Sequence, residues 1–362
     1  MASEVPHRFI ARGSTVSPPN RFEHAQHEAD YEHGFAEEDS LPGERRKIET
    51  VFLPDRAETL IRENDSPDVS FRYSLNAYRG CEHGCVYCYA RPGHETLGMN
   101  AGLDFETKIM VKHDAANLLR RELNKKSWQP EPIMISGVTD CYQPAERQFK
   151  LTRAILEVLL EAEHPFTLIT KNSLILRDLD LFRAFAERNL TAVALSITTL
   201  DAELARTMEP RTATPEAKLR AIRELTAAGV PVRVMTAPVV PGLNDHELPA
   251  ILTAARNAGA RSAGYVMLRL PWAVSPIFTA WLREHRPLQA EKVESLVKSV
   301  RGGKLYDANW GERMKGAGPY AEGIAKTFKA FCKKLGLDQP EPDLDCSRFR
   351  SPRLPGGQLR LF

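Results

Sequence analysis

The chain has 362 residues, of which 43% are hydrophobic and 27% are charged, an ordinary balance for a globular protein with a large buried core. A formal net charge of +2 neither requires nor excludes a nucleic acid partner, because a local basic patch fits within a near-neutral total. The longest apolar stretches fall far short of the roughly 20 residues that cross a bilayer, and the N-terminus has no signal-peptide pattern. We therefore expect a cytoplasmic protein without a membrane span.

Residues 1–66 are rich in charged residues and proline and show no sustained hydrophobic period, which predicts an extension that is either largely irregular or drapes over the domain. Between residues 67 and 287, short β-type runs alternate with amphipathic helical runs. The expected strands are 74–78, 133–137, 166–170, 192–198, 232–239 and 264–270. The expected helices between them are 114–123, 151–162, 179–187, 215–228 and 246–257.

The helix at 215–228 has well-marked ends: Thr214 as N-cap, Pro215 at the first helical position and Gly229 just beyond the last. Six strands alternating with helices predict βα units and a parallel sheet, because parallel neighbours need a crossover connection. Such units either close into a barrel or stay open. In both cases the functional site collects at the carboxyl ends of the strands.

Beyond the sheet, the sequence predicts a helix at 288–300 within a helical and Gly- and Lys-rich segment, residues 288–339. A Pro- and Arg-rich tail, residues 340–362, follows it. The tail interleaves basic and aromatic residues in a way that suits a single strand of DNA or RNA. These residues are Arg348, Phe349, Arg350, Arg353, Arg360 and Phe362.

Three of the six cysteines, Cys81, Cys85 and Cys88, form a C-x3-C-x2-C pattern directly after the first expected strand. Without a secretion signal, this number of cysteines favours reduced thiols with metal-binding or catalytic roles over disulfides. Runs of cysteine hold iron-sulfur clusters, and full ligation takes four thiolates. No fourth cysteine has a comparable spacing, so one iron would keep an open position, which is typical of catalytic metal sites.

With Tyr87 at the aromatic position, this motif resembles the signature of the radical S-adenosylmethionine (radical SAM) superfamily, and the resemblance covers about residues 70–285. It implies an α/β fold, a partial (β/α)6 barrel of parallel strands with N- and C-terminal extensions. It also implies a 4Fe-4S cluster whose open iron binds the amino and carboxylate groups of S-adenosylmethionine (SAM). One electron then cleaves the sulfonium to methionine and a 5′-deoxyadenosyl radical that attacks the substrate. A flavodoxin or ferredoxin is implied as electron donor.

The resemblance implies that SAM is bound mainly by residues at the ends of the second, third and fourth strands. Asp140 would accept from the amino group, and Lys171 would reach the carboxylate. Each assignment has a structural alternative: an ordinary turn at Asp140, a solvated Lys171, and internal hydrogen bonds for the strand hydroxyls. The expected cofactor-binding residues are Tyr87, Ser136, Thr139, Asp140, Lys171, Ser196 and Thr198.

Within the superfamily, the Thr-Asp pair followed by Glu146 resembles the spore photoproduct lyase branch, whose lyase repairs a thymine dimer in DNA. That lyase uses a cysteine as hydrogen donor, and its place falls at Gly137 here. Cys141 is the nearest candidate to replace it. The substrate is therefore left unknown, with base repair or modification of DNA or RNA as one alternative.

A different alternative is a non-catalytic zinc-binding scaffold. In it, the three cysteines and either His83 or His94 would form a closed tetrahedral site.

Overall fold

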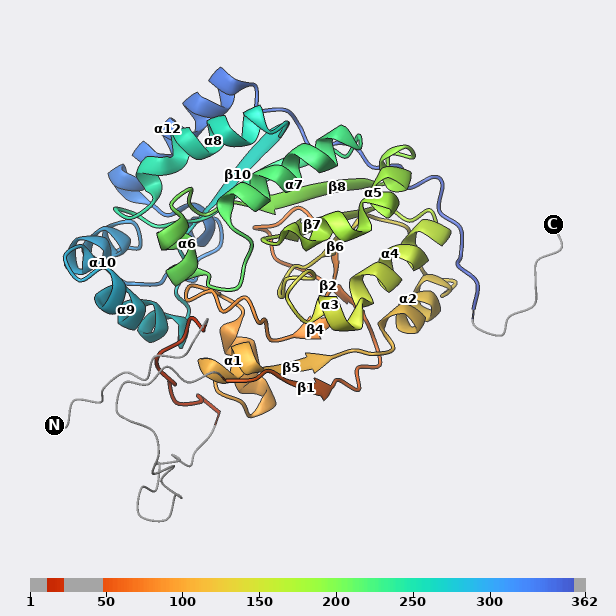
Figure 1. The fold of residues 1–362 in the computed structure, drawn as a ribbon, viewed down its shortest axis with the longest axis horizontal. Coiled ribbons are helices and arrows are strands. Elements are labelled where there is room, and N and C mark those ends of the chain that lie inside the picture. The colour runs from red at the N-terminus through yellow and green to blue at the C-terminus, as the bar shows by residue number, and fades with distance from the viewer. Residues whose placement is uncertain (1–11, 23–47, 355–362) are drawn as a thin grey trace, which may run out of the picture.

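The computed structural model describes residues 12–22 and 48–354 (Figure 1). Its main sheet has seven strands in the order β10-β9-β8-β7-β6-β3-β2. The strands from β3 to β10 are parallel, and the edge strand β2 is antiparallel to β3. The bounds are β2 Ile61–Glu63, β3 Tyr73–Leu75, β6 Ile133–Ile135, β7 Phe166–Thr170, β8 Thr191–Ser196, β9 Val232–Val239 and β10 Ser262–Met267.

The expected α/β fold with six parallel strands in chain order is confirmed, and β2 and β10 are the two edges of an open sheet. Because consecutive parallel strands are joined by right-handed crossovers, strands in chain order leave their helices on one face. Neighbouring helices on this face contact one another from α2 to α8. They are α2 Ala115–Leu123, α4 Leu151–Glu161, α5 Leu179–Ala186, α7 Pro215–Ala227 and α8 Leu248–Asn257, each close to its expected range.

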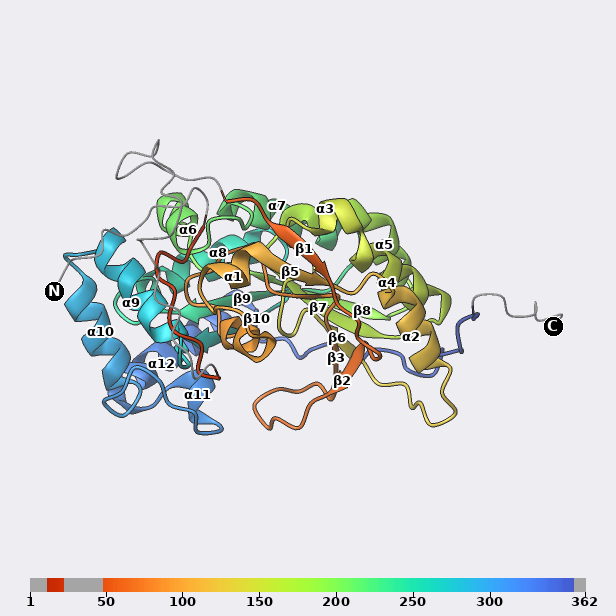
Figure 2. The ribbon, with the colours of Figure 1, turned by 90° about the horizontal axis from the view of Figure 1, so that it is seen from below.

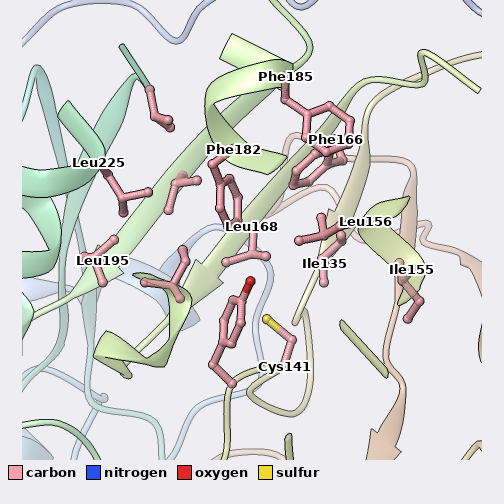
Figure 3. Packing of buried hydrophobic residues seen from close by; sticks show 14 of the residues in the cluster. Ile135, Cys141, Ile155, Leu156, Phe166, Leu168, Phe182, Phe185, Leu195 and Leu225 are labelled. Atoms are coloured by element: carbon pink, nitrogen blue, oxygen red, sulfur yellow. The ribbon is translucent and has the colours of Figure 1, made fainter. Parts of the chain in front are cut away.

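The core lies between the sheet and these helices (Figure 3). Phe166 and Leu168 alternate along β7 and are buried on the same face, as the period of two in a strand requires. Phe182 and Phe185 of α5 cover them, and the rings of Phe166 and Phe185 lie 4.7 Å apart in an edge-to-face arrangement. The apolar face of the sheet is thereby used for stability, which leaves the strand ends available for polar residues.

A second, smaller sheet lies beside the first, with strand order β1-β5-β4. Its strands are β1 Val51–Pro54, β5 Lys108–Val111 and β4 Tyr78–Arg79, and the short helical segments η1 Arg91–Leu97 and α1 Leu103–Thr107 lie between β4 and β5. Strands β1 and β2 both fall inside residues 1–66, which we expected to be irregular. Strands of three or four half-exposed residues are too short to show a period of two.

The chain after β10 adds four helices at the β10 end of the sheet (Figure 2). They are α9 Val274–His285, α10 Ala290–Ser299, α11 Glu312–Lys315 and α12 Gly318–Leu335. Helix α10 corresponds to the expected helix 288–300, whereas α9 was not expected. After α12, the Ala263 N–H of β10 donates to the Leu337 carbonyl (3.0 Å), so the chain covers the free edge of β10.

The described part of the tail runs past the amino ends of β7 and β8, opposite to the ends where a functional site is expected. Arg348 and Arg350 both pair with Glu163, at 2.8 and 2.7 Å, and the Phe349 ring packs 5.3 Å from the His164 ring. These contacts use the tail residues that were considered for nucleic acid binding, while Arg360 and Phe362 lie outside the described residues. The placement gives that interpretation no support.

None of the helices in the described ranges has both the length and the apolar composition of a membrane span.

The N-cap of α7 provides a stability test of the sequence interpretation. The Thr214 hydroxyl accepts from the Ala217 N–H at 3.3 Å. We expect Thr214→Ala to lower the free energy of unfolding by about 1 kcal/mol, measured by urea denaturation, because the first turn loses a partner. In the control Thr253→Ala, an exposed threonine inside α8 is replaced and stability should change by less than about 0.5 kcal/mol. Equal losses in the two variants would contradict the capping role.

Candidate functional site

Cys81, Cys85 and Cys88 lie in the loop between β4 and η1, and all three are free thiols. Cys81 and Cys85 are each only 7% exposed. Burial raises the pKa of Cys81, and the nearby charges of Asp140, Cys85 and Cys88 raise it further. Cys88 packs against the hydrophobic clusters that contain Cys81 and Cys85, so the three thiols lie in the same part of the protein.

The cysteine loop is fastened to the rest of the protein by its backbone. The Val86 N–H donates to the Met208 carbonyl at 3.1 Å. The fully buried Arg91 donates to the Cys85 carbonyl at 3.0 Å and pairs with the fully buried Glu106 at 2.5 Å. These contacts hold the loop without using any of the three sulfurs, so the thiols remain available to bind a metal centre.

The described N-terminal segment, residues 12–22, covers part of this loop. The backbone N–H groups of Gly13 and Ser14 donate to the Glu106 carboxylate at 2.9 and 2.8 Å. The approach is so close that a Cβ atom on Gly13 would lie 1.7 Å from the Gly84 carbonyl oxygen. Only glycine fits at this position, so this described segment lies directly against the cysteine loop.

The histidines considered as zinc ligands have other partners. His83 Nδ1 lies 3.5 Å from Asp140 Oδ2, its Nε2 lies 3.1 Å from Asn172 Nδ2, and His94 Nε2 lies 2.9 Å from the Lys108 carbonyl oxygen. Within residues 12–22 and 48–354, no group of three or more His, Cys, Asp or Glu side chains is spaced to hold a single metal ion. A 4Fe-4S cluster needs ligands that are spaced more widely than the ligands of a single metal ion, because each thiolate binds a different iron. The clustered thiols fit such a cluster, with one iron lacking a cysteine.

Asp140 lies in the loop after β6 and accepts hydrogen bonds from residues at the end of the neighbouring strand β7. Its Oδ1 accepts from the Thr170 hydroxyl (2.7 Å) and the Tyr142 N–H (2.9 Å), and its Oδ2 accepts from the Lys171 N–H (2.8 Å). With His83 beside Oδ2, this carboxylate also meets the cysteine loop. It therefore lies where the strand ends and the thiols come together.

Ser136 and Thr139, which precede Asp140, have protein partners of their own. The Ser136 hydroxyl donates to the Thr139 carbonyl (2.8 Å), and the Thr139 hydroxyl donates to the Tyr78 carbonyl (3.0 Å). Ser136 also has φ of +76°, in the left-handed region that serine seldom adopts. The two hydroxyls thus shape the loop that presents Asp140.

Lys171 reaches from the end of β7 across the end of β8. Its Nζ donates to the Ser196 hydroxyl (2.5 Å) and to the Ala237 carbonyl (2.9 Å), and it lies 5.8 Å from the Tyr87 ring centroid. The Thr198 hydroxyl donates to the same Ala237 carbonyl at 3.3 Å. Lys171, Ser196, Thr198 and Tyr87, all expected to bind the cofactor, are therefore brought together.

Glu209 is the main residue of this region that sequence reasoning missed, because nothing in its local sequence shows that its carboxylate would be buried. It is 1% exposed and accepts from Lys218 Nζ at 2.5 Å, from the Thr198 hydroxyl at 3.1 Å and from the Tyr87 hydroxyl. Burial alone would raise the pKa of Glu209, but the charges of Lys218 and Lys171 lower it to about 2. The sequence signal that could have identified Glu209 is its position in the segment that follows the carboxyl end of β8.

Cys141 directly follows Asp140, and its backbone N–H donates to the Ser136 hydroxyl at 3.1 Å, but its side chain is buried in the core. It is 3% exposed and belongs to the core cluster with Ile135 and Leu168, as Figure 3 shows. Burial raises the pKa of its thiol. A thiol packed among core residues is poorly placed to meet a substrate, so its role as hydrogen donor stays a hypothesis that this placement does not favour.

Residues 75–255, half of the chain, match the family model described as the radical SAM superfamily. An uncharacterized protein of Mycobacterium tuberculosis is 38% identical over 230 residues, which cover 63% of this chain and 68% of that protein. An uncharacterized protein of Methanocaldococcus jannaschii is 32% identical over 176 residues, which cover 49% of this chain and 63% of that protein.

Solved structures of spore photoproduct lyase share the fold. The lyase complexed with dinucleoside spore photoproduct is 16% identical, with a TM-score of 0.56 and coverage of 78% of this chain and 79% of that chain. A double mutant of the lyase with bound AdoMet and dinucleoside spore photoproduct has a TM-score of 0.55, 16% identity and 79% coverage of both chains. At this identity the likeness shows the fold alone.

The buried ion pair of Glu209 and Lys218 leads to a stability prediction. We expect Glu209→Gln to lower the free energy of unfolding by about 3–5 kcal/mol at neutral pH, because Lys218 would be left buried without its counter-charge. The control is Glu224→Gln, which removes an exposed pair with Arg220 and should cost about 0.5 kcal/mol or less. Urea denaturation of both variants measures the difference.

The ion pair of Glu209 and Lys218 also predicts the direction in which stability changes with pH. The pKa of Glu209, about 2, lies below its ordinary value of 4.5, so its contribution to stability is complete above 4.5 and is lost as the pH falls toward 2. The stability difference between wild type and Glu209→Gln should therefore shrink in acid. A difference that is small at neutral pH, or that grows in acid, would contradict the ion pair.

Proposed function

Because this chain belongs to the radical SAM superfamily, we propose that Cys81, Cys85 and Cys88 hold a 4Fe-4S cluster that cleaves SAM reductively. The observation that carries the proposal is the group of three free thiols, two buried and one partly buried, that lies near Asp140 at the ends of the parallel strands. When bound, the cluster supplies an electron and an open iron position. The protein supplies the site that binds and orients SAM.

Charge complementarity supports the assignments of Asp140 and Lys171. The methionyl end of SAM carries an ammonium and a carboxylate, and the two strand ends present one charge of each sign. Asp140 is held by three donors and lies beside the cysteine loop, so it is fixed before an ammonium arrives. Lys171 Nζ donates hydrogen bonds to neutral oxygens only, so the SAM carboxylate would be the first counter-charge that it bonds directly.

Hydroxyl groups and one ring complete the proposed SAM site. Ser196 and Thr198 lie on the same face of the β8 end, where their hydroxyls would meet the ribose. Tyr87 is fixed between Cys85 and Cys88 by its hydrogen bond to Glu209. Fixed partners of this kind spare the site from reorganising during the reaction.

The proposal includes an external electron donor, a flavodoxin or a ferredoxin, and a substrate whose identity is left open. Repair or modification of a DNA or RNA base remains the alternative within the same chemistry. It draws on the fold likeness to spore photoproduct lyase, whereas the tail contacts described above do not favour it.

Removal of one thiol tests the cluster. We expect anaerobically reconstituted wild type to be brown, to hold about four irons per chain and to form 5′-deoxyadenosine from SAM with dithionite. Cys85→Ala should lose the colour, most of the iron and the product, because two thiolates hold a cluster poorly. The control Cys346→Ala, outside the loop, should retain all three. A colourless wild type that keeps one zinc would refute the proposal.

The charge of Lys171 provides a second test. We expect Lys171→Gln to weaken SAM binding by about tenfold or more while iron content stays unchanged, because a charge-assisted hydrogen bond to the carboxylate is lost. Calorimetric titration of the reconstituted protein with SAM measures the dissociation constant. Lys126→Gln removes an exposed lysine and should leave binding unaltered. Equal affinities in Lys171→Gln and wild type would exclude the proposed contact.

A further inference from the structure

Arg269 follows β10 at its carboxyl end, the end at which the proposed SAM site lies. It is partly buried, and among the residues that the structure describes no carboxylate lies within ion-pair distance of it. Within residues 12–22 and 48–354, its one hydrogen bond goes from Nη1 to the Met314 sulfur at 3.4 Å, a weak acceptor, and its buried Nε has no partner there. Most of the donors of this guanidinium are therefore unused.

The surroundings of Arg269 carry an excess of positive charge. Arg301 is 2% exposed, binds only carbonyl oxygens, and also has a buried Nε without a partner. Burial, followed by the charge of Arg269, lowers the pKa of Arg301 to about 10, which Asp307 partly offsets. The charge of Arg269 also acts on Asp68, but Asp68 already pairs with Arg313 and accepts from the Gly311 N–H. The three arginines Arg269, Arg301 and Arg313 thus share only two nearby aspartates, Asp68 and Asp307.

Aromatic rings lie next to this unmatched charge. The Arg269 guanidinium lies 5.1 Å from the Tyr89 ring centroid, and Tyr89 is 46% exposed. Trp272, three residues further on, is 60% exposed and has φ of +43°, a strained backbone for a bulky residue. Such strain tends to occur at functional sites. Trp272 also lies 6.4 Å from the Tyr306 ring, and the Arg21 guanidinium lies over the Trp272 ring, 4.2 Å from its centroid. The part of the Trp272 side chain that these groups do not cover is presented to solvent.

Tyr89 connects this region to the proposed site. It directly follows Cys88, and its hydroxyl donates to the carbonyl of Gly137, in the loop that presents Asp140. A molecule that contacts Arg269 and Tyr89 would therefore lie next to the cysteine loop. That is where a substrate of the proposed enzyme must bind.

From this geometry we infer that Arg269 binds an anionic group, a phosphate or a carboxylate, of a substrate whose planar ring packs against Tyr89 and Trp272. The planar fork of arginine matches both anions, and a partly buried guanidinium without a counter-charge is stabilised when an anion arrives. The exposed rings suit an aromatic or heteroaromatic group. This inference rests on the proposed function only in calling the ligand a substrate.

Two matched ligand pairs test the site by calorimetry on the reconstituted protein with SAM, under anaerobic conditions. Thymidine 5′-monophosphate is compared with thymidine, and indole-3-acetate with indole-3-acetamide, so that each pair differs in one anionic group. We expect the anionic member of at least one pair to bind about tenfold or more tightly than its uncharged counterpart. The ligand pair that shows the preference identifies whether the site binds a phosphate or a carboxylate.

Arg269→Gln should abolish this preference without changing the affinity for the uncharged ligands. Arg269→Lys, which keeps the charge but loses the fork, should retain part of it. The control Arg283→Gln removes an arginine that is 67% exposed on α9 and should behave like wild type. Equal affinities within both pairs in wild type, or an undiminished preference in Arg269→Gln, would overturn the inference.

The test separates this inference from the proposed function, because binding is measured without turnover. Formation of 5′-deoxyadenosine from SAM and dithionite, without substrate, should be the same in wild type and Arg269→Gln. If wild type cleaves SAM but shows no anion preference, the anion site alone is refuted. If it shows the preference but never cleaves SAM, the proposed function alone is refuted.

Discussion

Parallel pairing of strands in chain order is the constraint on which the rest of this structure depends. In a parallel sheet all carboxyl ends lie at the same edge, so residues that follow successive strands meet there. Asp140 and Thr170 are 30 residues apart in the chain and hydrogen-bonded at 2.7 Å, and Lys171 meets Ser196 across 25 residues. The cysteine loop is fastened against the same edge. The site therefore consists of this loop and the residues that follow the strand ends.

Charges at this edge are held by fixed partners. Asp140 accepts three hydrogen bonds, and Glu209 pairs with Lys218 while it holds Tyr87. Buried charges are costly unless they are paired in this way, because the interior screens them poorly. The same pairing keeps donors and acceptors oriented before any ligand arrives. Stability and function are thus joined at Glu209: loss of its charge would both destabilise the fold and release the ring between two of the cysteines.

The chain after β10 contacts the loop that follows β2, at the opposite edge of the sheet. Arg313, in α11, pairs with Asp68 in the loop between β2 and β3, although 245 residues separate them. This contact brings the C-terminal segment to the mouth of the sheet. Asp68, whose pKa the charge of Arg269 also lowers, is already paired with Arg313, and none of the other described carboxylates forms an ion pair with Arg269.

The sequence by itself determined the features that depend on near neighbours. The spacing of Cys81, Cys85 and Cys88 predicted a cluster, and hydrophobic periods indicated six strands and their helices. Asp140 and Lys171 were expected in the site because the family resemblance and the strand-end rule point to the same positions. Only the tertiary structure decided which distant groups meet: the ion pair of Glu209, the core position of Cys141, and the strands too short to show a period. Local patterns report the conformation of a segment, whereas the partner of a charge is set by how segments pack, which no single segment encodes.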